Sequence, residues 1–127
     1  MSANRPSKIQ LHKRSKQLEL AYKGQSYFLS AEFLRVHSTS AEVKGHGPGQ
    51  EVLVSGKMNV GIETIKATGN YGLQIVFDDE HDSGIYSWSY LHELSLNQDK
   101  WWQDYLDKLQ SAQKSRDPLV SVIQFSP

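Results

Sequence analysis

The chain has 127 residues, no cysteine, and 14 basic side chains against 14 acidic ones. This length predicts a single domain with its own core, and the missing cysteines exclude disulfides, thiolate metal sites and cysteine nucleophiles. The balanced charge gives no field that would attract nucleic acid. No apolar stretch is long enough for a membrane span or a secretory signal. We therefore expect a cytoplasmic protein that binds neither nucleic acid nor a membrane.

The N-terminal part is basic and then becomes β-structure. Residues 1–7 are expected to form a flexible arm, and the first 16 residues carry five basic side chains and no acidic one. Weak contact with phosphates or an acidic partner is the alternative to a solvated arm, although no aromatic residues are interleaved as nucleic-acid binding would require. Residues 9–12 are typical of a short strand. Alternation over 18–22, a turn at Gly24 and apolar residues over 26–29 predict a β-hairpin.

A short helix and a loop come next. Ser30 is a candidate N-cap, and Phe33 and Leu34 supply an apolar face. Residues 37–50 have no apolar period and contain three of the nine glycines, so they predict a loop. Loops of this kind often carry binding residues on a rigid scaffold.

A second β region follows the loop. Residues 51–54 read as a short strand, and 61–68 and 73–77 as two strands joined by a turn at Gly69-Asn70. The acidic stretch 78–84 is a polar turn, after which 85–88 resumes a strand or begins a helix. A short helix continues through Leu91 and Leu94.

The clearest expected helix begins after Asn97, its candidate cap. Trp101, Tyr105 and Leu109 recur at helical spacing and form one apolar face. The helical region is expected to end at Asp117-Pro118. Residues 119–125 are strand-like and could add an edge strand or hold a partner.

These elements predict an α+β domain with a small mixed, mainly antiparallel β-sheet, short helices and a C-terminal amphipathic helix. The expected division is a core domain over 8–96 and a C-terminal helix with a strand-like tail over 97–127. Nothing in the pattern indicates a repeat.

One polar cluster could bind a divalent ion. Asp78, Asp79, Glu80, His81 and Asp82 place four carboxylates and an imidazole within five residues. Of these, Asp78, Asp79 and His81 are the candidate ligands. The cluster lacks the spacing of an EF-hand loop, so a solvated turn is the competing interpretation. The histidines His37 and His46 flank the loop and could meet His81 in space.

Other kinds of site find little support. The sequence has no Gly-x-Ser-x-Gly nucleophile elbow, and the glycine-rich stretch 45–49 lacks the Lys-Ser/Thr ending of a phosphate-binding loop. Trp101 and Trp102 are adjacent on the last helix, so one of them is expected to be partly exposed. We therefore predict an interaction surface that includes His37, His46 and Trp101.

Two stretches together resemble a known family. Residues 34–43, Leu-Arg-Val-His-Ser-Thr-Ser-Ala-Glu-Val, are similar to the Leu-Arg-x-x-Cys-x-Cys-Ala-x-Cys segment of the γ-butyrobetaine-hydroxylase-like N-terminal domain, also called DUF971. Residues 77–88, Phe-Asp-Asp-Glu-His-Asp-Ser-Gly-Ile-Tyr-Ser-Trp, are similar to its second signature. The resemblance covers roughly residues 8–95; the second motif is fairly specific, whereas the first is degraded.

The resemblance implies a zinc site that this chain has lost. Metal-binding members hold zinc with three cysteines and a histidine, and the corresponding positions here are Ser38, Ser40, Val43 and His81. Because a structural zinc site needs four nitrogen or sulfur ligands, we expect no cofactor.

The resemblance also implies an accessory role. In the hydroxylases this domain is appended to a separate catalytic domain, and elsewhere it stands alone or is fused to iron–sulfur carrier ATPases. We therefore expect a non-catalytic interaction module with a protein partner, possible settings being iron–sulfur protein maturation or another cytoplasmic assembly. The alternative is a metal- or small-ligand-binding protein that uses His81, Asp78 and Asp79.

Overall fold

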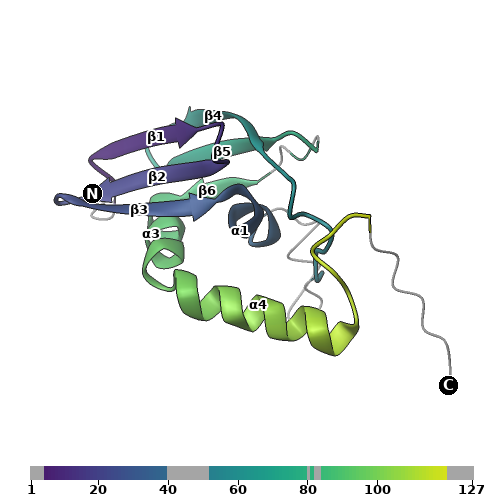
Figure 1. Cartoon of the computed structure of the whole chain (residues 1–127). Coiled ribbons are helices and arrows are strands. Elements are labelled where there is room, and N and C mark those ends of the chain that lie inside the picture. The colour runs from purple at the N-terminus through teal and green to yellow at the C-terminus, as the bar shows by residue number, and fades with distance from the viewer. Residues whose placement is uncertain (1–4, 40–51, 80, 82–83, 120–127) are drawn as a thin grey trace, which may run out of the picture.

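The computed structural model describes residues 5–39, 52–79, 81 and 84–119. These residues form six strands and three helices (Figure 1). In chain order they are β1 (Lys8–His12), β2 (Gln17–Tyr22), β3 (Gln25–Ser30), α1 (Ala31–Val36), β4 (Ile62–Thr68), β5 (Gly72–Phe77), β6 (Ile85–Ser87), α3 (Trp88–Leu96) and α4 (Gln98–Ala112).

The first sheet has the order β1-β2-β3, and all its pairings are antiparallel. The expected hairpin is confirmed: Tyr22 pairs with Gln25 across a two-residue turn. Lys23 and Gly24 both have positive φ, 49° and 84°. Positive φ at both turn residues matches the right-handed twist of the flanking strands.

The second sheet has the order β4-β5-β6 and is also antiparallel. A register shift interrupts the β4–β5 pairing between Ile62 and Thr64. At Gly72 the backbone of β6 comes so close that an added Cβ would lie 2.1 Å from the carbonyl oxygen of Tyr86. The glycine therefore allows β5 and β6 to pair where a side chain would separate them.

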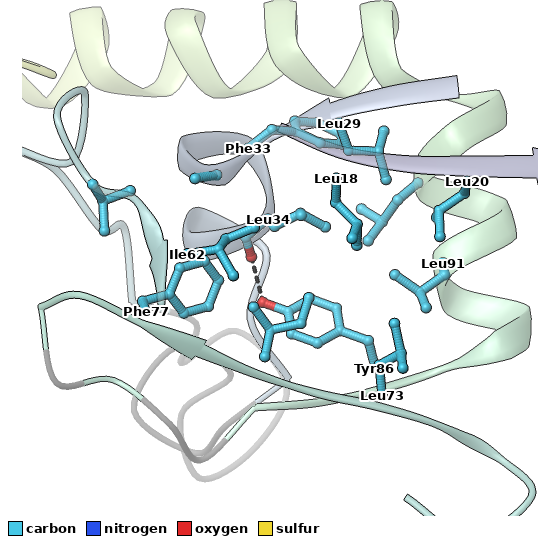
Figure 2. Packing of buried hydrophobic residues seen from close by; sticks show 14 of the residues in the cluster. Leu18, Leu20, Leu29, Phe33, Leu34, Ile62, Leu73, Phe77, Tyr86 and Leu91 are labelled. Carbon is cyan, nitrogen blue, oxygen red and sulfur yellow. Dashed lines mark hydrogen bonds between the residues drawn. The ribbon is translucent and has the colours of Figure 1, made fainter. Parts of the chain in front are cut away.

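One hydrophobic core joins the two sheets to α1 and α3. Figure 2 shows side chains of both sheets meeting around Leu34 and Tyr86. Tyr86 is fully buried, and its hydroxyl donates a hydrogen bond to the carbonyl oxygen of Leu34. The labelled members of this core are Leu18, Leu20, Leu29, Phe33, Leu34, Ile62, Leu73, Phe77, Tyr86 and Leu91. The α+β fold class expected from the sequence is thus confirmed.

The helix ends follow the sequence signals in part. Ser30 caps α1 as expected, because its Oγ accepts a hydrogen bond from the amide of Phe33 at 3.0 Å. Asn97 is expected to cap the last helix, but it makes no side-chain cap bond there. Its side-chain amide instead donates to the carbonyl oxygen of Glu93 at 2.8 Å. Asn97 thus closes α3 while its backbone begins α4.

Two boundaries differ from the expectation. Residues 52–54 are not a strand but an irregular segment that lies against α4. The last helix ends at Ala112, before Asp117, because Gln113 takes a left-handed conformation with φ of 57°. Most of the expected loop 37–50 and of the strand-like tail 119–125 lies outside the described residues.

The helix α4 runs along the side of the molecule that carries α1 and α3, opposite the strand β4 (Figure 1). Its buried residues Tyr105 and Leu109 pack with Val36 of α1 in a second, smaller cluster that Leu53 and Val54 extend. Among the described residues, no helix is both long and apolar enough to cross a membrane.

Candidate functional site

Two of the residues expected at zinc-ligand positions, Ser38 and His81, meet in a buried hydrogen bond. Ser38 follows the end of α1, and His81 lies in the turn after β5. The Oγ of Ser38 is 2.8 Å from the Nε2 of His81, and the two residues are 0% and 4% exposed. Residues 43 positions apart in the chain are thereby tied together inside the protein. Ser40 and Val43 lie outside the described residues.

Close packing surrounds this hydrogen bond. A Cβ added at Gly84 would lie 2.6 Å from the Oγ of Ser38. The ring of His81 also packs against Phe77, with ring centroids 6.0 Å apart. Burial raises the pKa of the neighbouring Tyr86, which keeps its hydroxyl protonated and available to bond Leu34. The pair therefore braces the core at the point where α1 approaches the second sheet.

The two candidate carboxylates bind other groups instead of joining His81. The carboxylate of Asp78 accepts from the amide of Gly61 at 3.0 Å. The Oδ2 of Asp79 accepts from Nε of Arg35 at 2.9 Å and from Nζ of Lys57 at 2.6 Å. Its Oδ1 accepts from the backbone amide of His81 at 3.2 Å. The oxygens of Asp79 therefore stabilise the turn after β5 and do not join the His81 ring in a metal-ligand group.

The charge of Asp79 is well compensated. Burial alone would raise the pKa of Asp79, but the hydrogen bonds from Lys57 and Arg35, the charge of Arg35 and the amide of His81 outweigh burial and lower it. The side chain of Arg35 is 8% exposed, and its buried Nη1 has no hydrogen-bond partner among the described residues. The ion pair thus neutralises a buried guanidinium between α1 and the turn after β5.

This arrangement does not fit a zinc ion. Within the residues that the structure describes, no three His, Cys, Asp or Glu side chains gather as a metal-ligand group. The oxygen of Ser38 lies at hydrogen-bond distance from the only imidazole of the set, and serine is a poor zinc ligand. Ser38 and His81 are therefore held by a hydrogen bond between protein groups.

A pocket of about 540 Å³ lies beside this position, between the end of α1, residues 52–54 and α4. Its volume falls in the range of ligand pockets. Two residues of the predicted interaction surface, His37 and Trp101, line it together, whereas His46 lies outside the described residues. The remaining lining residues are Val36, Ser38, Val52, Leu53, Val54, Tyr90, Asp104, Tyr105 and Lys108.

The aromatic wall of the pocket is held in place by hydrogen bonds. The rings of His37 and Trp101 stack at 6.0 Å with an interplanar angle of 24°. The hydroxyl of Tyr90 donates to the carbonyl oxygen of His37 at 2.7 Å, and that of Tyr105 donates to Val54 at 2.7 Å. Burial raises the pKa of both tyrosines to about 12, so both stay protonated donors at neutral pH.

Sequence reasoning missed several residues of these two sites. Arg35 and Lys57 were not expected to bind Asp79, because ion pairs between distant segments leave no local pattern. The pocket residues Asp104 and Lys108 had a usable signal, since they fall at three and seven positions after Trp101 and so share its helix face.

The comparisons with known proteins agree with the resemblance seen in the sequence. Residues 9–92 match the family model described as gamma-butyrobetaine hydroxylase-like, N-terminal. Among curated proteins, none is significantly similar to the chain.

Several solved structures are similar to this chain, among them the following three. One protein, solved by NMR in solution, is 56% identical with a TM-score of 0.81 and covers 94% of this chain and 95% of its own. A second, also solved by NMR, is 44% identical with a TM-score of 0.76, and the match covers 97% of this chain and 93% of the other. A crystal structure of a DUF971 protein of unknown function from Acidithiobacillus ferrooxidans is 29% identical with a TM-score of 0.60. The match covers 72% of this chain and 93% of the other. The chain belongs to the gamma-butyrobetaine hydroxylase-like N-terminal family, also known as DUF971.

Proposed function

We propose that this chain is a non-catalytic accessory domain that binds a protein partner in a cytoplasmic assembly. The pocket between α1 and α4 is the contact surface in this proposal. The observation that carries it is the half-exposed, stacked pair of His37 and Trp101 on a pocket wall. Partly exposed tryptophan in a preformed concave surface is typical of binding sites.

The buried serine–histidine pair supports a binding role over a catalytic one. A serine nucleophile must reach its substrate, and Ser38 has no exposed surface. The carboxylate of Asp79, two residues before His81, accepts from the backbone amide of His81 and from two cations. It therefore does not orient the His81 ring as a catalytic carboxylate would.

Replacing Trp101 by alanine should abolish partner binding while the domain stays folded. Tyr71→Ala is the matched control, because Tyr71 is an aromatic side chain that is 58% exposed in the turn between β4 and β5. Chemical crosslinking in cells, followed by mass spectrometry, should recover the same protein with the wild type and with Tyr71→Ala, and lose it with Trp101→Ala. Equal recovery with all three proteins would contradict this contact surface.

The alternative function is metal binding through His81, Asp78 and Asp79. It rests on the proximity of Ser38 and His81, which places two of the family's ligand positions in contact. Because the hydrogen bonds of this region are made within the protein, we expect no stoichiometric metal.

Native mass spectrometry of the protein, purified without chelator and titrated with zinc, tests this expectation. The bare polypeptide mass and an unchanged Tm are the expected results, since a ligand that binds only the folded state would raise Tm. One retained zinc ion in the wild type that is lost in a folded His81→Ala variant would establish the metal-binding alternative.

A further inference from the structure

We infer that the pocket between α1 and α4 accepts the cationic side chain of a partner protein, a lysine or an arginine. This inference rests on the proposed function and specifies the chemistry of the same surface. Three features carry it: the aromatic wall, the carboxylate of Asp104, which pairs with no described residue, and the position of Lys108.

The aromatic wall favours a cation over an uncharged apolar group. The negative face of an indole ring attracts an ammonium or guanidinium group, and tryptophan is the strongest of the aromatic side chains in this respect. Trp101 stacks on His37, which fixes the plane of the indole at the pocket. Tyr105 donates its hydroxyl proton to Val54, so its oxygen can act only as an acceptor toward an incoming N–H donor.

Asp104 supplies the charge that complements a cation. It is exposed at the pocket, one helical turn after Trp101 on the same face of α4. Its carboxylate makes no ion pair or hydrogen bond with any described residue. An aromatic face and a free carboxylate one turn apart provide the two components that bind an organic cation.

Lys108 determines which end of the pocket the cation occupies. It lies four residues after Asp104, a spacing at which oppositely charged side chains often pair, yet the two form no ion pair here. Its ammonium group repels a second cation at its own end of the pocket. The ligand's charge is therefore placed between Trp101 and Asp104, and an acidic group of the same partner segment would lie toward Lys108.

Titration of the ¹⁵N-labelled protein with n-butylammonium chloride tests the inference, with 1-butanol as an uncharged probe of similar size and n-propylguanidinium as the arginine analogue. We expect both cations to shift the indole N–H signal of Trp101 saturably, and butanol to shift it far less. Asp104→Asn should weaken cation binding by roughly threefold, and Lys108→Gln should strengthen it by a similar factor, because each variant removes one surface charge. Asp107→Asn, the same change on the next exposed carboxylate of α4, should leave the affinity unchanged.

Equal shifts with butanol, or an Asp104→Asn affinity equal to that of the wild type, would overturn the inference. Partner capture that depends on Trp101 but not on Asp104 would overturn it while the proposed function stands. Cation binding that depends on Asp104, without any partner whose capture depends on Trp101, would overturn the protein source of the cation and with it the proposed function.

Discussion

Asp79→Asn is expected to lower the free energy of unfolding by about 3 kcal/mol, because it removes the charge that compensates a buried guanidinium. Arg35 bonds Asp79 through Nε, and its Nη1 has no hydrogen-bond partner. An asparagine can keep one oxygen near these donors, but it leaves the charge of Arg35 uncompensated in the protein interior. For a domain of this size the loss corresponds to a Tm lower by about 10 °C, which differential scanning calorimetry can measure.

The dependence on pH identifies the cause of that loss. The pKa of Asp79 is lowered in the folded state, so its carboxylate stabilises the fold above the pKa it has in the unfolded chain, and this contribution disappears as the pH falls through the folded-state pKa. The stability difference between the wild type and Asp79→Asn should thus be full at pH 7 and shrink under acid conditions. Asp104→Asn removes an exposed carboxylate that pairs with no described residue, and it should change stability little. A difference between the wild type and Asp79→Asn that stayed constant down to pH 2 would contradict the ion-pair explanation.

The parts of the fold that local chemistry determines were predictable from the sequence. The hairpin of β2 and β3 follows from alternating apolar residues and a turn at Lys23 and Gly24. The start of α1 follows from Ser30, whose hydroxyl bonds an amide three residues later. In each case the information lies within a few residues, which a pattern can detect.

Other features depended on contacts between distant segments. Residues 52–54 have the β-branched and apolar composition of a strand, but they form none, and Leu53 and Val54 pack against the cluster of Tyr105 and Leu109. Local propensity gave way to tertiary packing there. Asn97 differs for a local reason: its side-chain amide donates to the carbonyl oxygen of Glu93, four residues earlier, and so closes the preceding helix.

The candidate site was predictable as a set of positions but not as a geometry. The family motifs placed Ser38 and His81 in one region, and the structure joins them by a hydrogen bond. The sequence also suggested Asp78 and Asp79 as ligands, because it could not reveal that Gly61, Arg35 and Lys57 bind them. His37 and Trp101 were predicted for one surface, and they are brought together at one pocket.

Two contacts tie the first helix to the second sheet. In this chain α1 is tied to the second sheet by the bond from Tyr86 to Leu34 and by the ion pair of Arg35 with Asp79. A third contact, the ion pair of Glu32 with Arg116, fixes the other side of α1 to the segment after α4. Because the pocket is formed by α1 and α4 together, that link also controls the shape of the proposed binding surface.

Arg116→Met is expected to destabilise the domain by about 3 kcal/mol, because Glu32 would be left as a buried carboxylate without its counter-ion. Both guanidinium nitrogens that contact Glu32 do so at short range: Nε to Oε2 at 2.8 Å and Nη2 to Oε1 at 2.7 Å. The hydrogen bond with Glu32 raises the pKa of Arg116, as expected for a paired cation. Glu32 is 5% exposed, and Arg116 also lies 5.0 Å from the ring centre of Trp102. Urea unfolding followed by tryptophan fluorescence measures the loss.

Three further variants separate the ion pair from the other roles of this segment. Lys114→Met removes a neighbouring exposed cation and should have little effect. The double variant Glu32→Leu/Arg116→Met removes both charges and should recover most of the stability, since a buried ion pair replaced by apolar side chains is often neutral. Arg116→Lys keeps the charge but not the two-pronged geometry, and should fall between the wild type and Arg116→Met. The backbone bonds from Gly56 to Ser115 and from Met58 to Arg116 are retained in every variant. A double variant as unstable as Arg116→Met would therefore show that packing of the arginine stem on Trp102, and not its charge, holds α1 against α4.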